Sequence, residues 1–165
     1  MYVFTGEGAG KTTASLGLAM RSLGHNHKVI LIQFLKGRKN IGEYKIQKYL
    51  KNYKVYQFGK PAFINLNKPG KEDIELAKKG LEFISEAVKQ KPKLLILDEI
   101  NIATAYGLLD VNEAVATIKK IPKSMDVVLT GRYAPKKFIE LADYSNEVKI
   151  MKQPKKITAK KGIQY

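Results

Sequence analysis

The 165-residue sequence contains no cysteine, no tryptophan and only two histidines. Without cysteine, disulfide frameworks, thiolate catalysis and cysteine-bound zinc or iron–sulfur centres are excluded. His25 and His27 lie in one turn with no acidic cluster beside them, so we expect surface residues and not a metal site. No run approaches the roughly 18 apolar residues that cross a bilayer, and the apolar stretch at 2–4 is too short for a signal peptide. We therefore expect a cytoplasmic globular protein.

Acidic residues are also scarce, since 15 Asp and Glu face 30 Lys and Arg and leave a formal charge of +15. Such a field attracts phosphates, nucleic acids or anionic membrane surfaces. A lysine-rich solvated surface with no specific partner is the alternative interpretation. The length fits one domain over residues 1–165.

Apolar runs alternate with helical spacings along the chain. Runs without polar alternation indicate strands buried on both faces, and the order of strands and helices predicts a three-layer, doubly wound, mostly parallel α/β sheet. The expected strands are residues 2–5, 29–34, 94–97, 127–129 and 148–151. The expected helices are residues 11–23, 74–88, 111–121, with Asp110 as its cap, and 138–142, and a loop is expected over 59–71.

A glycine-rich segment joins the first expected strand to the first expected helix. Residues 5–13 match the phosphate-loop pattern G-x-x-x-x-G-K-[ST], except that Thr5 stands at the first glycine. Inward-facing amides, the helix N-terminus and Lys11 can hold phosphate oxygens, and the Thr12 hydroxyl can bind magnesium. The candidate nucleotide-binding residues are Gly6, Glu7, Gly8, Ala9, Gly10, Lys11, Thr12 and Thr13.

Polar residues follow two further strands. The run at 94–97 ends in Asp98 and Glu99, and the run at 127–129 is followed by Arg132. Ligands of open α/β sheets bind beyond the carboxyl ends of the strands. We therefore expect Thr12, Asp98 and Glu99 to hold magnesium, and Arg132 to reach a phosphate. No motif supports a Ser-His-Asp set for acyl transfer.

The chain resembles the corrinoid adenosyltransferases that use ATP, which act on cob(I)yrinic acid a,c-diamide or cob(I)alamin and have a RecA-like phosphate-loop fold. The strings that carry the resemblance are VFTGEG at 3–8, GKTT at 10–13, QFLKG at 33–37, LDEIN at 97–101, YGLL at 106–109, LTGR at 129–132 before Ala134-Pro135, and KGI at 161–163. Thr5 in place of the first glycine is expected in this family.

The resemblance implies a complete reaction. ATP would lie with its triphosphate against residues 6–13, and a Co(I) corrinoid would attack the ribose C5′ carbon and release triphosphate. Lys11, Glu99 and Arg132 would be the catalytic residues, and magnesium would bind Thr12, Asp98 and Glu99. Phe63 would lie beneath the corrin ring. The family also implies a homodimer. We further expect an electron-transfer reductase for Co(II) as a partner, no membrane partner, and nucleic acid only under the alternative given below.

Three positions depart from the family pattern. Asn65 stands where the family usually has Trp, Ala9 where it has Lys, and Gln153 where a His-containing tail motif is expected. These changes leave open a different corrinoid preference or a non-catalytic corrinoid or nucleotide carrier.

The main alternative is a RecA-like nucleic-acid-binding ATPase. Residues 44–60 interleave five aromatic side chains with five lysines, a combination typical of single-strand binding. In that case Glu99 would polarise water and the products would be ADP and phosphate. Against it, the spacing of Ile46, Tyr49 and Leu50 indicates one face of a helix, so some of these aromatics are expected in the core.

Overall fold

Six parallel strands form a single sheet in the order β3-β2-β4-β5-β1-β6. In this computed structural model residues 1–62, 64–156 and 158–164 are described. The strands are β1 (Tyr2–Thr5), β2 (Val29–Phe34), β3 (Tyr53–Phe58), β4 (Leu94–Asp98), β5 (Asp126–Thr130) and β6 (Tyr144–Glu147). The helices are α1 (Lys11–Gly24), α2 (Gly42–Lys45), the 3₁₀ turn η1 (Ile46–Lys48), α3 (Lys71–Lys89), α4 (Ile100–Ala105), α5 (Val111–Lys119) and α6 (Lys136–Leu141). The expected three-layer α/β class is confirmed.

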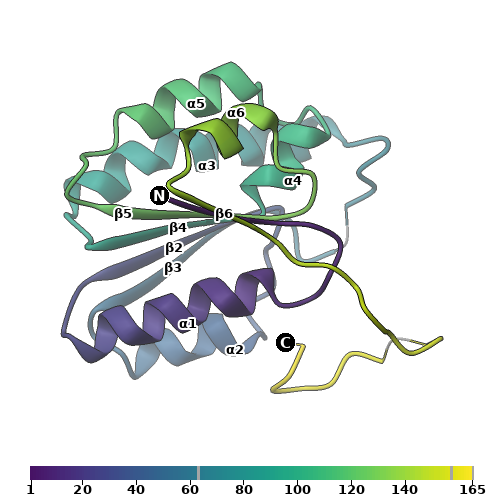
Figure 1. The fold of residues 1–165 in the computed structure, drawn as a ribbon, viewed down its shortest axis with the longest axis horizontal. Coiled ribbons are helices and arrows are strands. Elements are labelled where there is room, and N and C mark those ends of the chain that lie inside the picture. The colour runs from purple at the N-terminus through teal and green to yellow at the C-terminus, as the bar shows by residue number, and fades with distance from the viewer. Residues whose placement is uncertain (63, 157, 165) are drawn as a thin grey trace.

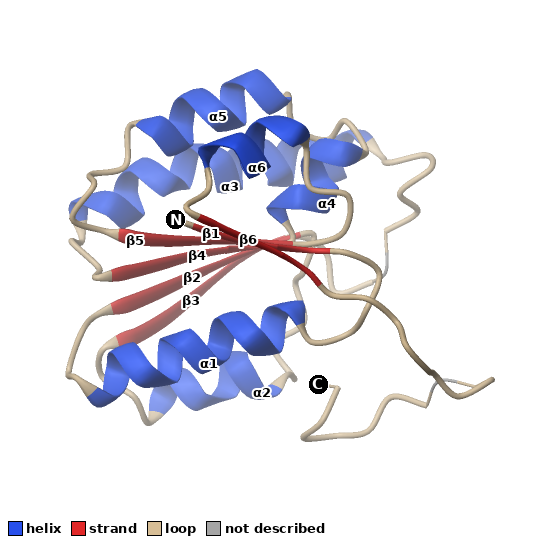
Figure 2. Ribbon diagram, viewed as in Figure 1, coloured by secondary structure: helices blue, strands red, loops and turns tan. Residues whose placement is uncertain are grey.

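Helices cover both faces of the sheet and create two cores. Helices α1 and α2 lie on one face, and α3 to α6 lie on the other (Figures 1 and 2). Every residue of β2 is buried, because Ile30 and Ile32 enter the larger core with α3 to α6 while Val29 and Leu31 enter the smaller core with α1. Burial on both faces explains why this strand shows no polar alternation.

The strand order brings distant loops to one edge of the sheet. Strand β5 lies between β1 and β4, and β2 lies on the other side of β4. Because all strands are parallel, the segments that follow β1, β2, β4 and β5 emerge at the same edge. The phosphate-loop candidate, Asp98 and Glu99 therefore meet there. Among the described residues, no helix is both long and apolar enough to cross a membrane.

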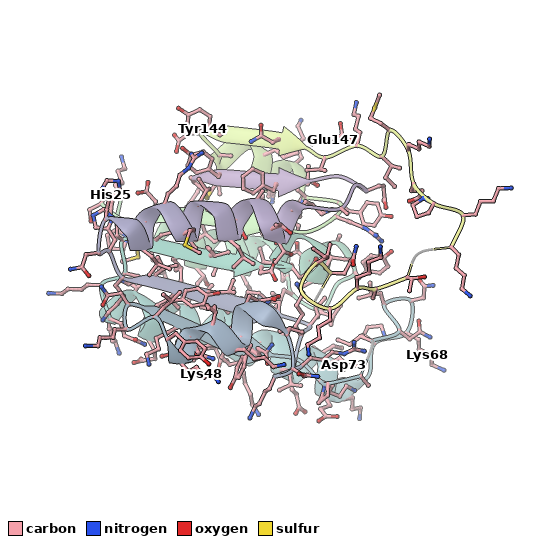
Figure 3. All side chains as sticks on the ribbon, turned by 90° about the horizontal axis from the view of Figure 1, so that it is seen from below. His25, Lys48, Lys68, Asp73, Tyr144 and Glu147 are labelled. Carbon is pink, nitrogen blue, oxygen red and sulfur yellow. The ribbon has the colours of Figure 1, made fainter. Side chains whose placement is uncertain are left out.

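The last strand differs from the sequence-based expectation of 148–151. The strand is Tyr144–Glu147, paired with β1 in the register Tyr2 to Tyr144, and the chain leaves the sheet after Glu147 (Figure 3). All four residues are exposed at the edge of the sheet, and so β6 carries no apolar run. The apolar residues from Val148 onward instead follow the strand as extended chain.

Four further elements were missing from the prediction, namely β3, α4 and the short helical turns α2 and η1. Strand β3 interleaves polar residues with apolar ones at the sheet edge, and α4 has only six residues, too few to establish a helical period. Elsewhere the differences are confined to element ends: α5 stops at Lys119, while β4 and β5 extend to Asp98 and Thr130. His25 and His27 are exposed, as expected.

Candidate functional site

The phosphate loop connects β1 to α1 and is held against the chain that follows β6. The amide of Gly8 donates to the carbonyl of Val148 at 2.8 Å, and the amide of Val148 donates to the carbonyl of Thr5 at 2.8 Å. Gly6 has φ +96°, and a Cβ there would lie 2.5 Å from the Val148 carbonyl oxygen. Only glycine fits this combination of backbone angle and close approach.

Lys11 opens α1 with its ammonium folded over the loop. Its Nζ donates to the carbonyl of Gly8 at 2.6 Å, and the residue is only 8% exposed. Burial lowers the pKa of Lys11, and the charge of Arg132 acts in the same direction, while Glu99 and Glu7 oppose them. The loop thus holds a cation beside the helix N-terminus, which suits an anionic ligand.

Asp98 ends β4 and is fully buried in a network of hydrogen bonds. Its Oδ1 accepts from Thr12 Oγ1 at 2.8 Å and Thr130 Oγ1 at 2.6 Å, and its Oδ2 accepts from Gln33 Nε2 at 3.1 Å and Lys36 Nζ at 2.7 Å. Burial alone would raise the pKa of Asp98, but the Lys36 charge and these hydrogen bonds hold it below its ordinary value. The carboxylate links the phosphate loop to β2 and β5.

Glu99 follows Asp98 in the chain, and its pKa is shifted in the opposite direction. Burial and the neighbouring charge of Asp98 raise the pKa of Glu99, against the lowering influence of Lys36 and Lys11. Its backbone is left-handed, with φ 65°, and its amide donates to Thr130 Oγ1 at 3.1 Å. A non-glycine residue in this conformation persists only where the surrounding structure determines it, and such residues cluster at functional sites.

Arg132 is half-exposed in the segment after β5. Its Nε is 3.4 Å from Glu7 Oε2, an ion pair with both partners about half-exposed. A hydrogen bond from Tyr133 to Glu7 raises the pKa of the Tyr133 phenol. The amide of Ala134 donates to Thr5 Oγ1 at 3.0 Å, so the residue that replaces the first glycine joins the phosphate loop to this segment.

Sequence reasoning missed three residues of the site. Lys36 Nζ lies 2.7 Å from Asp98 Oδ2 and 3.8 Å from Glu99 Oε1. Burial lowers the pKa of Lys36, but these two carboxylates outweigh it and raise the pKa overall. Gln33 also donates to Glu43 Oε1 at 3.3 Å, and Thr130 joins Asp98 to Glu99. The signal was present, because Gln33 and Lys36 belong to the QFLKG string and Thr130 to the LTGR string.

The oxygen donors at this edge fit a magnesium ion held together with phosphates. Thr12 gives its hydroxyl hydrogen to Asp98, so the lone pairs of Oγ1 remain for a cation. Glu99 adds a partly exposed carboxylate, and Asp98 orients Thr12 from behind. No group of three His, Asp or Glu side chains suited to a metal occurs in the described part of the chain. Magnesium does not need one, because it takes one or two carboxylates plus substrate phosphates.

The remaining predicted residues lie around or beyond this cluster. Ala9 and Thr13 are exposed at the loop and the first turn of α1. Phe63 falls outside the described residues. Asn65 is exposed, and its Oδ1 accepts from the amide of Asn67 at 3.2 Å within the same turn. Gln153 is exposed in the segment after β6.

A family profile described as "ATP:corrinoid adenosyltransferase BtuR/CobO/CobP" matches residues 1–165. The chain belongs to this family. A corrinoid adenosyltransferase of Sinorhizobium sp is 34% identical over 171 residues, covering 100% of this chain and 79% of that protein. A corrinoid adenosyltransferase of Pseudomonas aeruginosa is 31% identical over 168 residues, covering 100% of this chain and 83% of that protein. The resemblance found in the sequence is confirmed.

A solved structure with low sequence identity to this chain shares its fold. The flagellar accessory protein FlaH from Methanocaldococcus jannaschii superimposes with a TM-score of 0.50 at 15% identity. The match covers 85% of this corrinoid adenosyltransferase family member and 64% of the FlaH chain. Such a likeness concerns the fold alone.

Proposed function

We propose that this protein transfers the 5′-deoxyadenosyl group of ATP to the Co(I) centre of a corrinoid and releases triphosphate. The observation that carries the proposal is the hydrogen bond of 2.8 Å from Thr12 to Asp98, which joins a phosphate loop to an acidic strand end. The charges of Lys11 and Glu99 next to that contact influence each other. Membership of the adenosyltransferase family supplies the acceptor class.

In this reaction the reduced cobalt is the nucleophile. Two electrons from Co(I) form the cobalt–carbon bond at C5′, the C5′–O bond breaks, and triphosphate leaves with that bonding pair. The cobalt becomes formally Co(III), and no proton moves at C5′. The protein needs neither a general base nor its own nucleophile, in keeping with a site that offers cations and hydrogen-bond donors.

Charge neutralisation is the main task of the protein in this proposal. Lys11 places a buried ammonium beside the loop amides, where it stabilises the growing charge on the leaving triphosphate. Arg132 adds a second cation after releasing or sharing Glu7. Thr12, Asp98 and Glu99 would hold magnesium, whose chemistry is to neutralise phosphate oxygens. Phe63 remains the residue proposed for the corrin ring.

A nucleic-acid-dependent ATPase has less support. Tyr53 is 2% exposed, and Tyr56 and Phe58 pack with Phe83 at ring distances of 4.4 and 5.3 Å. Tyr49 is 70% exposed, contrary to its expected place on a buried helical face. One exposed ring cannot form the series of stacking platforms that single-strand binding uses.

The proposal also covers the location, oligomeric state and partners of the enzyme. We propose a cytoplasmic enzyme that acts as a homodimer, takes ATP and a corrinoid such as cob(I)alamin or cob(I)yrinic acid a,c-diamide, and receives its substrate from a separate reductase. Sedimentation of the purified protein, with and without both substrates, tests the dimer directly.

The proposed adenosyl transfer is tested with the purified protein in the absence of oxygen. The protein is mixed with magnesium ATP and chemically reduced cobalamin or cobinamide, and the corrinoid absorption spectrum is followed. Conversion to the alkylated corrinoid supports the transferase, whereas an unchanged Co(I) spectrum with ATP intact supports the carrier. Lys149→Ala serves as the matched control for lysine substitutions in the loop, because Lys149 is exposed and pairs with Glu147.

A further inference from the structure

Lys36 places an ammonium among the three oxygen ligands assigned to magnesium. Its Nζ lies 2.7 Å from Asp98 Oδ2, 3.5 Å from Thr12 Oγ1 and 3.8 Å from Glu99 Oε1. The side-chain oxygens of Thr12, Asp98 and Glu99 thus all lie near the ammonium of Lys36, which is in the loop after β2. The side chain is 29% exposed, so part of it is open to solvent.

The backbone around Lys36 is built to hold it there. Leu35 adopts a left-handed conformation with φ 61°, and its amide donates to the Phe58 carbonyl at 3.0 Å. At Gly37 a Cβ would lie 2.2 Å from the carbonyl oxygen of Gly59, so the loops after β2 and β3 cross in backbone contact. A strained leucine persists only where surrounding contacts determine it, and such strain clusters at functional positions.

The ligands are also oriented without Lys36. Asp98 still receives hydrogen bonds from Thr12, Thr130 and Gln33, and these partners come from three different elements. Removal of the ammonium would therefore leave an oriented carboxylate with unsatisfied negative charge. A divalent cation would meet the same oxygens and would be repelled by the ammonium at close range.

We propose that Lys36 is a resident counter-cation that occupies the metal position in the nucleotide-free protein and yields it when magnesium nucleotide binds. The inference rests on the proposed function, because that function brings magnesium nucleotide to this site. The flexible four-carbon stem and its exposed side give the ammonium room to turn toward incoming phosphates. The positive charge of Lys36 thereby prevents a metal ion from binding until the nucleotide arrives.

The test measures Mn²⁺ binding to nucleotide-free protein by electron paramagnetic resonance, with neither ATP nor corrinoid present. Lys36→Met removes the charge at similar length, and Lys36→Gln keeps a hydrogen-bond donor without charge. We expect both variants to bind Mn²⁺ about tenfold or more tightly than wild type. We also expect Mg²⁺ alone to raise the melting temperature of both variants and not that of wild type.

Lys60→Met is the matched control, because Lys60 also pairs with a buried aspartate, Asp73, at 2.7 Å, and its ion pairs are with Asp73 and Glu72 and not with the ligands assigned to magnesium. Unchanged Mn²⁺ affinity in both Lys36 variants would overturn the proposal and leave Lys36 as an ordinary ion-pair partner. An equal gain in Lys60→Met would overturn it too, because overall charge would then be the cause. Failure of adenosyl transfer in wild type would contradict the proposed function instead, and the metal measurement does not depend on it.

Discussion

Two buried charges of opposite sign define the site at the scale of single residues. Lys11 lies over the phosphate loop with its pKa lowered mainly by burial, and Asp98 lies behind it with its pKa lowered by Lys36 and by donated hydrogen bonds. Glu99, next to Asp98, has its pKa raised by burial and by that neighbour. Adjacent carboxylates with opposite pKa shifts suit the two roles proposed for them, with Asp98 orienting the network and Glu99 facing the ligand.

Lys11→Ala should lower the rate of adenosyl transfer by about 10² to 10³-fold, because the triphosphate loses a buried cation as its charge grows. Single-turnover conversion of the Co(I) corrinoid, followed by absorption under anaerobic conditions, measures this. Lys149→Ala should transfer at the wild-type rate. A turnover of Lys11→Ala close to that of wild type would show that Lys11 does not contribute to the reaction.

Asp98→Asn should reduce the free energy of unfolding by about 3–5 kcal/mol at pH 7, because it leaves the Lys36 charge without its buried partner. The pKa of Asp98 is lower in the folded state than its ordinary 3.8, so its stabilising contribution is present above that value and is lost as the pH falls through the folded pKa. The difference between variant and wild type in urea unfolding should therefore shrink below about pH 4. A difference that stays constant from pH 7 to 3 would contradict this assignment.

At the scale of elements, burial decided what the sequence could predict. Strand β2 and helix α3 were predictable because they bury a continuous run and a regular apolar face. Strand β6 was misplaced because an exposed edge strand is polar on both faces, and β3 was missed because its polar residues break the apolar pattern. The cap of α5 was predicted correctly, since Asp110 accepts from the amides of Asn112 and Glu113 at 2.8 and 2.9 Å.

Asp110→Ala should lower the free energy of unfolding by about 1 kcal/mol, because the first turn of α5 loses the acceptor for two amides. Transfer activity should not change, as α5 lies away from the phosphate loop. Glu140→Ala is the comparison, because its exposed contact with Lys136 at 3.6 Å contributes little. Equal stability of Asp110→Ala and wild type in urea unfolding would show that the cap contributes nothing.

Two glycine-to-alanine substitutions should change stability in opposite directions. Gly6→Ala should destabilise the protein by about 1–2 kcal/mol from its positive φ alone, and it should weaken ATP binding because Val148 must move. Gly17→Ala should stabilise it by about 0.5–1 kcal/mol, since a Cβ there meets nothing within 4 Å inside α1. Thermal unfolding measures the stability of both variants, and nucleotide titration measures their ATP binding. A Gly6→Ala variant with wild-type stability would contradict the tight contact of Gly6 with the chain after β6.

At the scale of the whole molecule, a strongly basic chain keeps a local cluster of carboxylates at one edge of its sheet. The parallel topology made the meeting of Thr12, Asp98 and Glu99 predictable, because strand ends that carry motifs share that edge. Lys36 was not predictable as their partner, since its place depends on a left-handed Leu35 and on a crossing with the loop after β3. Such backbone features have no periodic signature in a sequence.

In the proposed function the protein uses ATP for transfer to cobalt and not for hydrolysis. The most direct measurement is phosphorus nuclear magnetic resonance of a reaction that contains magnesium ATP, chemically reduced corrinoid and single-stranded DNA. We expect tripolyphosphate in an amount equal to that of the alkylated corrinoid, and we expect the DNA to change neither. ADP and inorganic phosphate that increase with DNA, while the corrinoid stays unalkylated, would contradict it.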